Sequence, residues 1–106
     1  MAEIQADVVR AVRVLRAKLT PALDIRRTLV FGSHARGDPG PDSDIDVCII
    51  VGNVENSFRE TLVASAASAL IDPRIEPIVL SEAEFEAGSF GVIAQIKKTG
   101  RLLDAS

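Results

Sequence analysis

The feature that most constrains the fold is a pair of apolar runs separated by a short segment rich in Gly, Pro, Asp and Ser. The first run ends at Phe31, the second covers residues 45–51, and residues 32–43 lie between them. The runs indicate buried strands, and the segment between them indicates a loop. That loop is too short for the crossover that parallel strands need. Residues 28–31 and 45–51 are therefore predicted to be antiparallel neighbours.

Helical periodicity and breaking residues divide the rest of the chain. Residues 3–19 predict an amphipathic helix that ends before Pro21. A capping-box pattern at Ser57 predicts a second helix reaching about Ile71. The apolar spacing places four of its residues on the buried face: Phe58, Leu62, Ala66 and Leu70.

The last third predicts a strand over 74–80 and two more helices. A second capping box at Ser81 begins a short helix that Gly88 ends, and residues 90–98 form the last helix with Gly100 as its C-cap. Leu102 and Leu103 are expected to pair briefly with the sheet. The fold class is α/β (α+β), a small mixed sheet flanked by helices, in one domain over residues 1–106.

Composition limits the possible partners. The net charge of −3 argues against an extended nucleic-acid surface, and no apolar stretch approaches the roughly 20 residues of a membrane helix. The lone Cys48 fits a reducing compartment, so a cytoplasmic location is expected. A homo-oligomer stays open, because the first helix and the Ala-rich helix serve either an interface or the core.

Asp44 and Asp46 are the first candidate site residues. Residues i and i+2 of a strand point to the same face, so the two carboxylates lie side by side and repel each other. A hard divalent cation such as Mg²⁺, held by carboxylates and substrate phosphates, relieves this repulsion. The plainer alternative is a turn residue followed by a solvent-facing strand residue.

The Gly32-Ser33 pair follows the first strand. Glycine permits close approach of a ligand, and the Ser33 amide and hydroxyl can bind a phosphate oxygen. The lysine of a P-loop is missing. Arg36 either binds phosphate or holds Asp38 or Asp42. His34, the only histidine, is expected to be a solvent-facing loop residue.

Glu76 is the third candidate carboxylate. It shares a strand face with Ile78 and Leu80, and a charge there is explained if it joins Asp44 and Asp46 as a metal ligand or a proton acceptor. The alternative is an exposed charge on an edge strand, which Pro77 favours because proline donates no ladder hydrogen bond.

Gly32-Ser33, then ten residues, then Asp44-x-Asp46, with Arg36-Gly37 between and Ser43 just before, resembles the minimal nucleotidyltransferases of the DNA polymerase beta superfamily. The resemblance covers nearly the whole chain. It implies a nucleotidyltransferase-like fold, ATP as donor and two Mg²⁺ ions. It also implies that Asp44, Asp46 and Glu76 are the catalytic and metal-binding carboxylates. The nucleotide-binding residues it implies are Gly32, Ser33, Arg36 and Ser43.

The shortest members of this family often pair with a HEPN-domain toxin, and some are antitoxins that transfer AMP to it. The resemblance therefore implies a protein adenylyltransferase of the antitoxin type with a HEPN-domain partner. His34 stands where Arg is common, and Glu76 where Asp is common. Two alternatives stay open: an inactive module of the same fold that masks a partner, and an adenylyltransferase for a small molecule of the aminoglycoside type.

Overall fold

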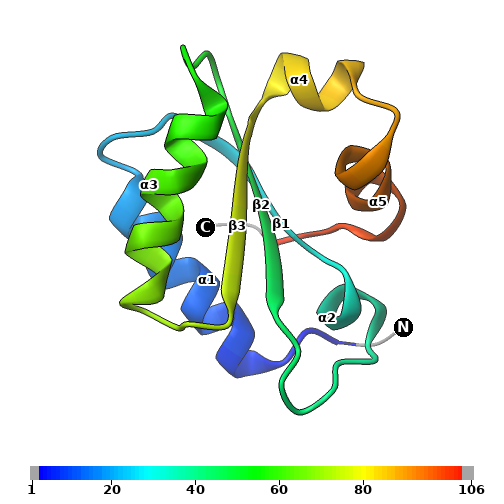
Figure 1. The fold of residues 1–106 in the computed structure, drawn as a ribbon. Coiled ribbons are helices and arrows are strands. Elements are labelled where there is room, and N and C mark those ends of the chain that lie inside the picture. The colour runs from blue at the N-terminus through cyan, green and yellow to red at the C-terminus, as the bar shows by residue number, and fades with distance from the viewer. Residues whose placement is uncertain (1–2, 104–106) are drawn as a thin grey trace.

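The computed structural model describes residues 3–103, which form one four-stranded mixed sheet with helices on both faces (Figure 1). In chain order the elements are α1 (Ala6–Leu19), β1 (Ile25–Phe31), α2 (Ser33–Arg36), β2 (Ile45–Val51), α3 (Ser57–Ala69), β3 (Ile75–Ser81), α4 (Glu82–Ala87), α5 (Gly91–Thr99) and β4 (Arg101–Leu102). The predicted fold class is thereby confirmed.

The strands lie in the order β3-β2-β1-β4. β1 and β2 are antiparallel, as predicted from the short connection, and β4 pairs antiparallel with the other edge of β1. β2 and β3 are parallel, and α3 makes the crossover between them. The parallel register places Asp46 beside Glu76, so the topology itself brings two of the candidate residues together.

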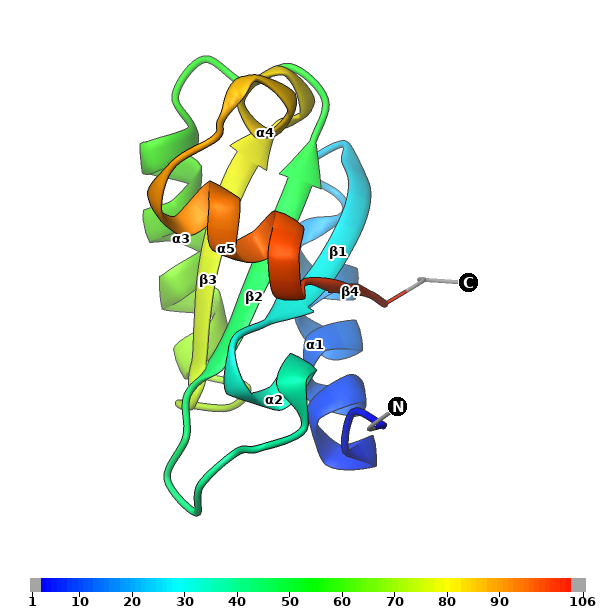
Figure 2. The same ribbon diagram turned by 90° about the vertical axis from the view of Figure 1, so that its right-hand side faces the viewer.

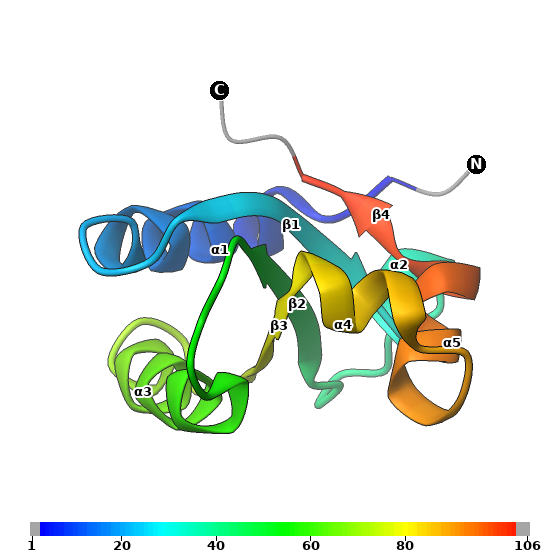
Figure 3. The ribbon, with the colours of Figure 1, turned by 90° about the horizontal axis from the view of Figure 1, so that it is seen from above.

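Two apolar layers lie on the two faces of the sheet. On one face, Val8, Val12 and Leu15 of α1 pack with the odd-numbered residues of β2. On the other face, Ile96 of α5 packs with Cys48 and Ile50. Figure 3 shows this division, with α1 and α3 on one side of the sheet and α2, α4 and α5 on the other. The even-numbered face, which includes Asp46, is therefore the α5 side.

The edge strand β3 has partners for the backbone N–H groups at alternate positions. Ile75 N–H donates to the Asp72 carbonyl, and Val79 N–H donates to the Thr61 hydroxyl at 2.8 Å. Ser81 N–H donates to the Glu84 carboxylate, and Pro77 has no N–H. The edge position that Pro77 predicted is confirmed.

The predicted buried face of the second helix is wrong. α3 buries Ala64 and Ser68, whereas Phe58 and Leu70 are 70% and 82% exposed. The small residues let the helix approach β3 closely enough for Thr61 to bind Val79. Its N-cap is also one residue earlier than predicted, because the Asn56 side chain accepts from Arg59 N–H.

The other differences concern helix ends and short elements. The capping box at Ser81 is confirmed, with both of its reciprocal hydrogen bonds present. The predicted loop over residues 32–43 contains the one-turn helix α2, and the first strand begins three residues earlier than predicted, at Ile25.

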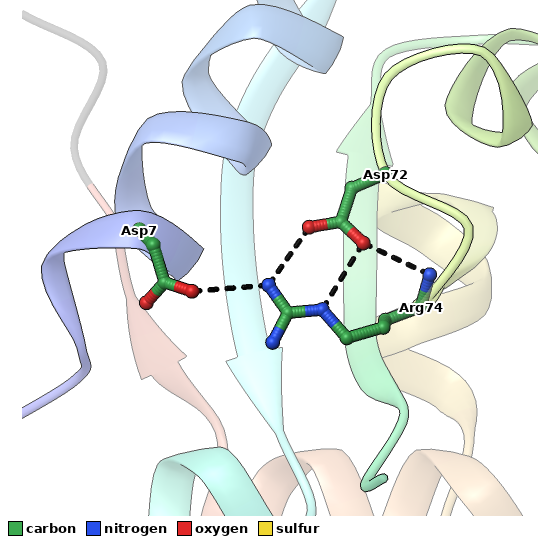
Figure 4. A network of polar contacts seen from close by, with 3 residues as sticks. All are labelled: Asp7, Asp72 and Arg74. Atoms are coloured by element: carbon green, nitrogen blue, oxygen red, sulfur yellow. Dashed lines mark hydrogen bonds and ion pairs between the residues drawn. The ribbon is translucent and has the colours of Figure 1, made fainter. Parts of the chain in front are cut away.

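An arginine fastens the turn before β3 to the first helix (Figure 4). The Arg74 guanidinium donates to both oxygens of Asp72 at 3.1 and 2.8 Å, and to Asp7 of α1 at 3.1 Å. Arg74 holds the pKa of Asp72 and of Asp7 below the ordinary value of an aspartate through these hydrogen bonds. Asp72 is therefore a structural residue that helps to set where β3 begins, at Ile75, one residue before Glu76.

Candidate active site

Three carboxylates lie at neighbouring strand starts on the α5 side of the sheet. Asp44 precedes β2, Asp46 is its second residue, and Glu76 is the second residue of β3. Asp46 is paired with Phe31 on one side and Glu76 on the other. Figure 2 looks onto this face and shows α5 crossing the middle of the strands, while α2 lies beside their lower ends. The predicted grouping of these residues at one place in the sheet agrees with the register.

The Asp46 carboxylate lies directly against the backbone of Gly32. Gly32 has φ +72° and ψ −149°, a region that side chains rarely adopt. A Cβ on Gly32 would collide with Asp46 Oδ2 and lie 3.3 Å from Asp46 Cγ. The backbone conformation therefore favours glycine here, and a Cβ would also have to displace the Asp46 carboxylate. The Gly-Ser turn and the Asp-x-Asp motif form one unit.

The carboxylates perturb one another. Partial burial raises the pKa of Asp46, and the Asp44 charge raises it further, while His34 and Arg36 oppose the rise. The Asp44 charge is the main cause of a raised pKa at Glu76, followed by desolvation and the Asp46 charge. This is the electrostatic pattern of a site that concentrates negative charge and is relieved by a cation.

The donor chemistry fits a hard divalent cation held by two carboxylates. Asp44 and Asp46 offer the oxygen ligands that Mg²⁺ prefers, and substrate phosphates commonly complete such a site. Within residues 3–103, no group of three or more His, Cys, Asp or Glu side chains is arranged so that it could hold a metal ion. The fit therefore concerns the Asp pair, and Glu76 lies close enough for its pKa to respond to both of them.

The candidate phosphate-binding residues surround the Gly32 turn. Ser33 begins α2, and the Gly32 N–H donates to the Thr99 hydroxyl of α5 at 3.4 Å. Arg36 forms an exposed ion pair with Asp38 at 3.4 Å, the loop-holding role that the sequence left open. The Ser43 hydroxyl accepts from the Gly40 N–H at 2.6 Å. These contacts fix the loop between the two strands, and none of them buries Arg36.

His34 is the residue that the sequence reasoning placed wrongly. It was expected to face solvent, but only 4% of it is exposed, because α2 directs it and Ala35 inward. Within the described part of the chain, neither ring nitrogen has a hydrogen-bond partner. Its imidazole also opposes the rise in the pKa of Asp46. Its place directly after Gly-Ser, in the same turn that contacts Asp46, is the signal that could have identified it.

Comparison with known proteins decides the family. The family model described as a nucleotidyltransferase domain matches residues 12–103. The chain belongs to the nucleotidyltransferase domain family. This confirms the resemblance drawn from the Gly-Ser and Asp-x-Asp motifs. A search of curated proteins gives no match.

Solved structures share the fold of this nucleotidyltransferase domain. A protein from Sulfolobus solfataricus, named as a nucleotidyltransferase, is 22% identical with a TM-score of 0.67, and the match covers 90% of this chain and 78% of that one. A toxin–antitoxin structure with AMP-PNP is 15% identical with a TM-score of 0.67, covering 92% and 73%. The MntA–HepT toxin–antitoxin structure is 14% identical with a TM-score of 0.63, covering 96% and 74%.

None of the helices in residues 3–103 is both long and apolar enough to cross a bilayer.

Proposed function

We propose that this protein transfers a nucleotidyl group, AMP from ATP, to a hydroxyl group of a partner protein. The observation that carries the proposal is the contact between the Asp46 carboxylate and the Gly32 turn. This contact places a paired-carboxylate motif beside a turn whose amide and hydroxyl groups suit a phosphate. Membership of the nucleotidyltransferase domain family supports the same chemistry.

Each residue then has a chemical role. Asp44 and Asp46 would hold Mg²⁺, two ions in all, which supply charge neutralisation for the triphosphate and the developing transition state. Gly32, Ser33 and Ser43 orient the phosphates, and Arg36 adds positive charge at the open side of the loop. The acceptor oxygen attacks the α-phosphorus, the bond to the β-phosphate oxygen breaks, and pyrophosphate leaves.

Glu76 is proposed as the group that takes the proton of the acceptor hydroxyl. Its carboxylate is exposed on the edge strand, so an acceptor can reach it. The Asp44 and Asp46 charges raise its pKa, which makes it a stronger base than an ordinary glutamate.

The proposed acceptor is a HEPN-domain toxin in the cytoplasm, with this chain, as one domain over residues 1–106, acting as its antitoxin. The support is the fold that this chain shares with a chain of two toxin–antitoxin structures, one of them with AMP-PNP. The proposal requires transfer itself, which distinguishes it from a module of the same fold that only masks its partner.

The test is transfer of label from ATP carrying a labelled α-phosphate. The purified protein, Mg²⁺ and lysate from its own source are incubated and the products are separated. A labelled protein band is expected with the wild type and with the matched control Asp42→Asn, an exposed loop carboxylate, but not with Asp44→Asn or Asp46→Asn. A labelled small molecule would identify a different acceptor class. Absence of label, with ATP-independent capture of a partner, would establish a masking module instead.

A further inference from the structure

The outer face of α1 carries a groove that the nucleotidyltransferase chemistry does not use. A hollow of about 630 Å³ is lined by Ile4 and by residues of α1 as far as Ala17, and a second of about 190 Å³ continues it to Thr20. The two hollows share Arg13 and Ala17. α1 covers the sheet face opposite to the one that carries Asp46. This groove is therefore separate from the carboxylate site.

The groove has the geometry of a binding site for another helix. Its walls are two rows of side chains spaced by four residues: Ala6, Arg10 and Val14, and Val9, Arg13 and Ala17. A ridge of side chains on a second helix fits between two such rows. The alanines at the ends of the rows allow close approach, and Val14 is 49% exposed although it belongs to a helix with a well-packed opposite face.

The groove is also strongly basic. α1 contains Arg10, Arg13, Arg16 and Lys18 and a single carboxylate, Asp7, which Arg74 already binds. Within residues 3–103, none of these four cations forms an ion pair with a carboxylate of this chain. The chain as a whole carries a net charge of −3. Positive charge thus gathers without compensation along one helix of an acidic protein.

We propose that the α1 groove binds an acidic amphipathic helix of a partner protein. The apolar side chains of that helix pack against Val9 and Val14, and its carboxylates pair with Arg10 and Arg13. Apolar contact combined with guanidinium groups is the composition of a protein interface. A second copy is a poor occupant, because a symmetric contact would bring the same arginines together. RNA is a poor occupant as well, because the floor is aliphatic and offers no aromatic ring on which a base could stack.

The test uses the full chain and a phage-displayed library of helical peptides about four turns long, matching the 14 residues of α1. Selection should enrich peptides with Asp or Glu at i and i+3 or i+4 beside aliphatic residues. Reversing two charges, Arg10→Glu with Arg13→Glu, should weaken binding of the selected peptide by at least about tenfold, and Val14→Asp should do the same. The matched control is Arg59→Glu, which reverses an exposed cation on α3.

Four outcomes would overturn the proposal. Selection could yield no acidic amphipathic peptides, or yield peptides that bind the charge-reversed protein equally well. Fluorescently labelled single-stranded RNA could bind the same arginines more tightly than the selected peptide. Sedimentation could reveal a dimer that the charge reversal dissociates. The α1 variants and the Arg59→Glu control all lie at exposed positions, and circular dichroism should show that each remains folded.

Discussion

The contact between Gly32 and Asp46 predicts an unusually costly glycine substitution. Gly32→Ala would force a Cβ into the space of the Asp46 carboxylate while the backbone stays at φ +72°. Gly91 provides a matched control, because it also has positive φ, +58°, but a Cβ there meets nothing within 4 Å. The two substitutions share backbone strain and differ in the collision.

The expected magnitudes follow from this difference. The left-handed conformation costs an alanine about 1–2 kcal/mol, which is the whole cost expected for Gly91→Ala. At Gly32 the backbone region is less favourable, about 1–3 kcal/mol, and the collision adds an interaction of about 0.5–3 kcal/mol with Asp46. A loss of 3 kcal/mol lowers the melting temperature of a domain of this size by more than about 10 °C.

Urea denaturation of four proteins separates the two contributions: the wild type, Gly32→Ala, Asp46→Ala and the double variant. In the Asp46→Ala background, Gly32→Ala should cost only the backbone strain. The double-mutant cycle should therefore give an interaction energy between the two positions of at least about 0.5 kcal/mol. If Gly32→Ala is no more costly than Gly91→Ala, or if the cycle is additive, Asp46 does not close over the turn and the assignment of one joint site is wrong.

Three further predictions concern charge and packing. Folding raises the pKa of the Glu76 carboxyl above its ordinary value of 4.5, so the free energy of unfolding should fall as pH rises from 4.5 through the raised pKa. Asp44→Asn removes the main cause of the raised pKa. It should therefore flatten this fall in urea titrations between about pH 4 and 7, and it should also abolish transfer. Ala64→Leu should cost about 1–3 kcal/mol by overpacking α3 against β3, whereas Leu62→Ser on its exposed side should change stability by less than about 0.5 kcal/mol in thermal melts. Arg74→Ala should lower the melting temperature at pH 7 and much less at pH 3, because the carboxylates it binds have lowered pKa values and their stabilising contribution disappears as they protonate.

The structure could be predicted from the sequence where a local pattern allows only one arrangement of the backbone. The short connection between two apolar runs forces antiparallel neighbours, and the capping box at Ser81 satisfies two backbone donors at once. Alternation of side chains along a strand predicts that Asp44 and Asp46 share a face, and the charge of Glu76 beside Ile78 and Leu80 predicts that it joins them. The pairing of Asp46 with Glu76 across β2 and β3 agrees with that expectation.

The predictions were wrong where a segment could adopt two local arrangements. α3 has apolar residues on more than one face, and the structure uses Ala64 and Ser68 because a helix lying close to β3 can satisfy Val79 N–H through Thr61. That contact between distant segments is invisible to periodicity. His34 was assigned to a loop because Gly, Pro and Asp dominate its surroundings, yet a single helical turn is enough to bury it.

The edge of β3 has a consequence for how other proteins can attach. Partners often bind by adding a strand to an exposed sheet edge, which requires free backbone donors at alternate positions. Along β3 these positions are already occupied or lack a donor: Ile75, Val79 and Ser81 donate within the chain, and residue 77 is proline. An incoming strand would find carbonyl groups without matching N–H groups. This edge is thus protected against edge-to-edge strand pairing with further copies of the chain. A partner that binds at this edge has to contact side chains instead.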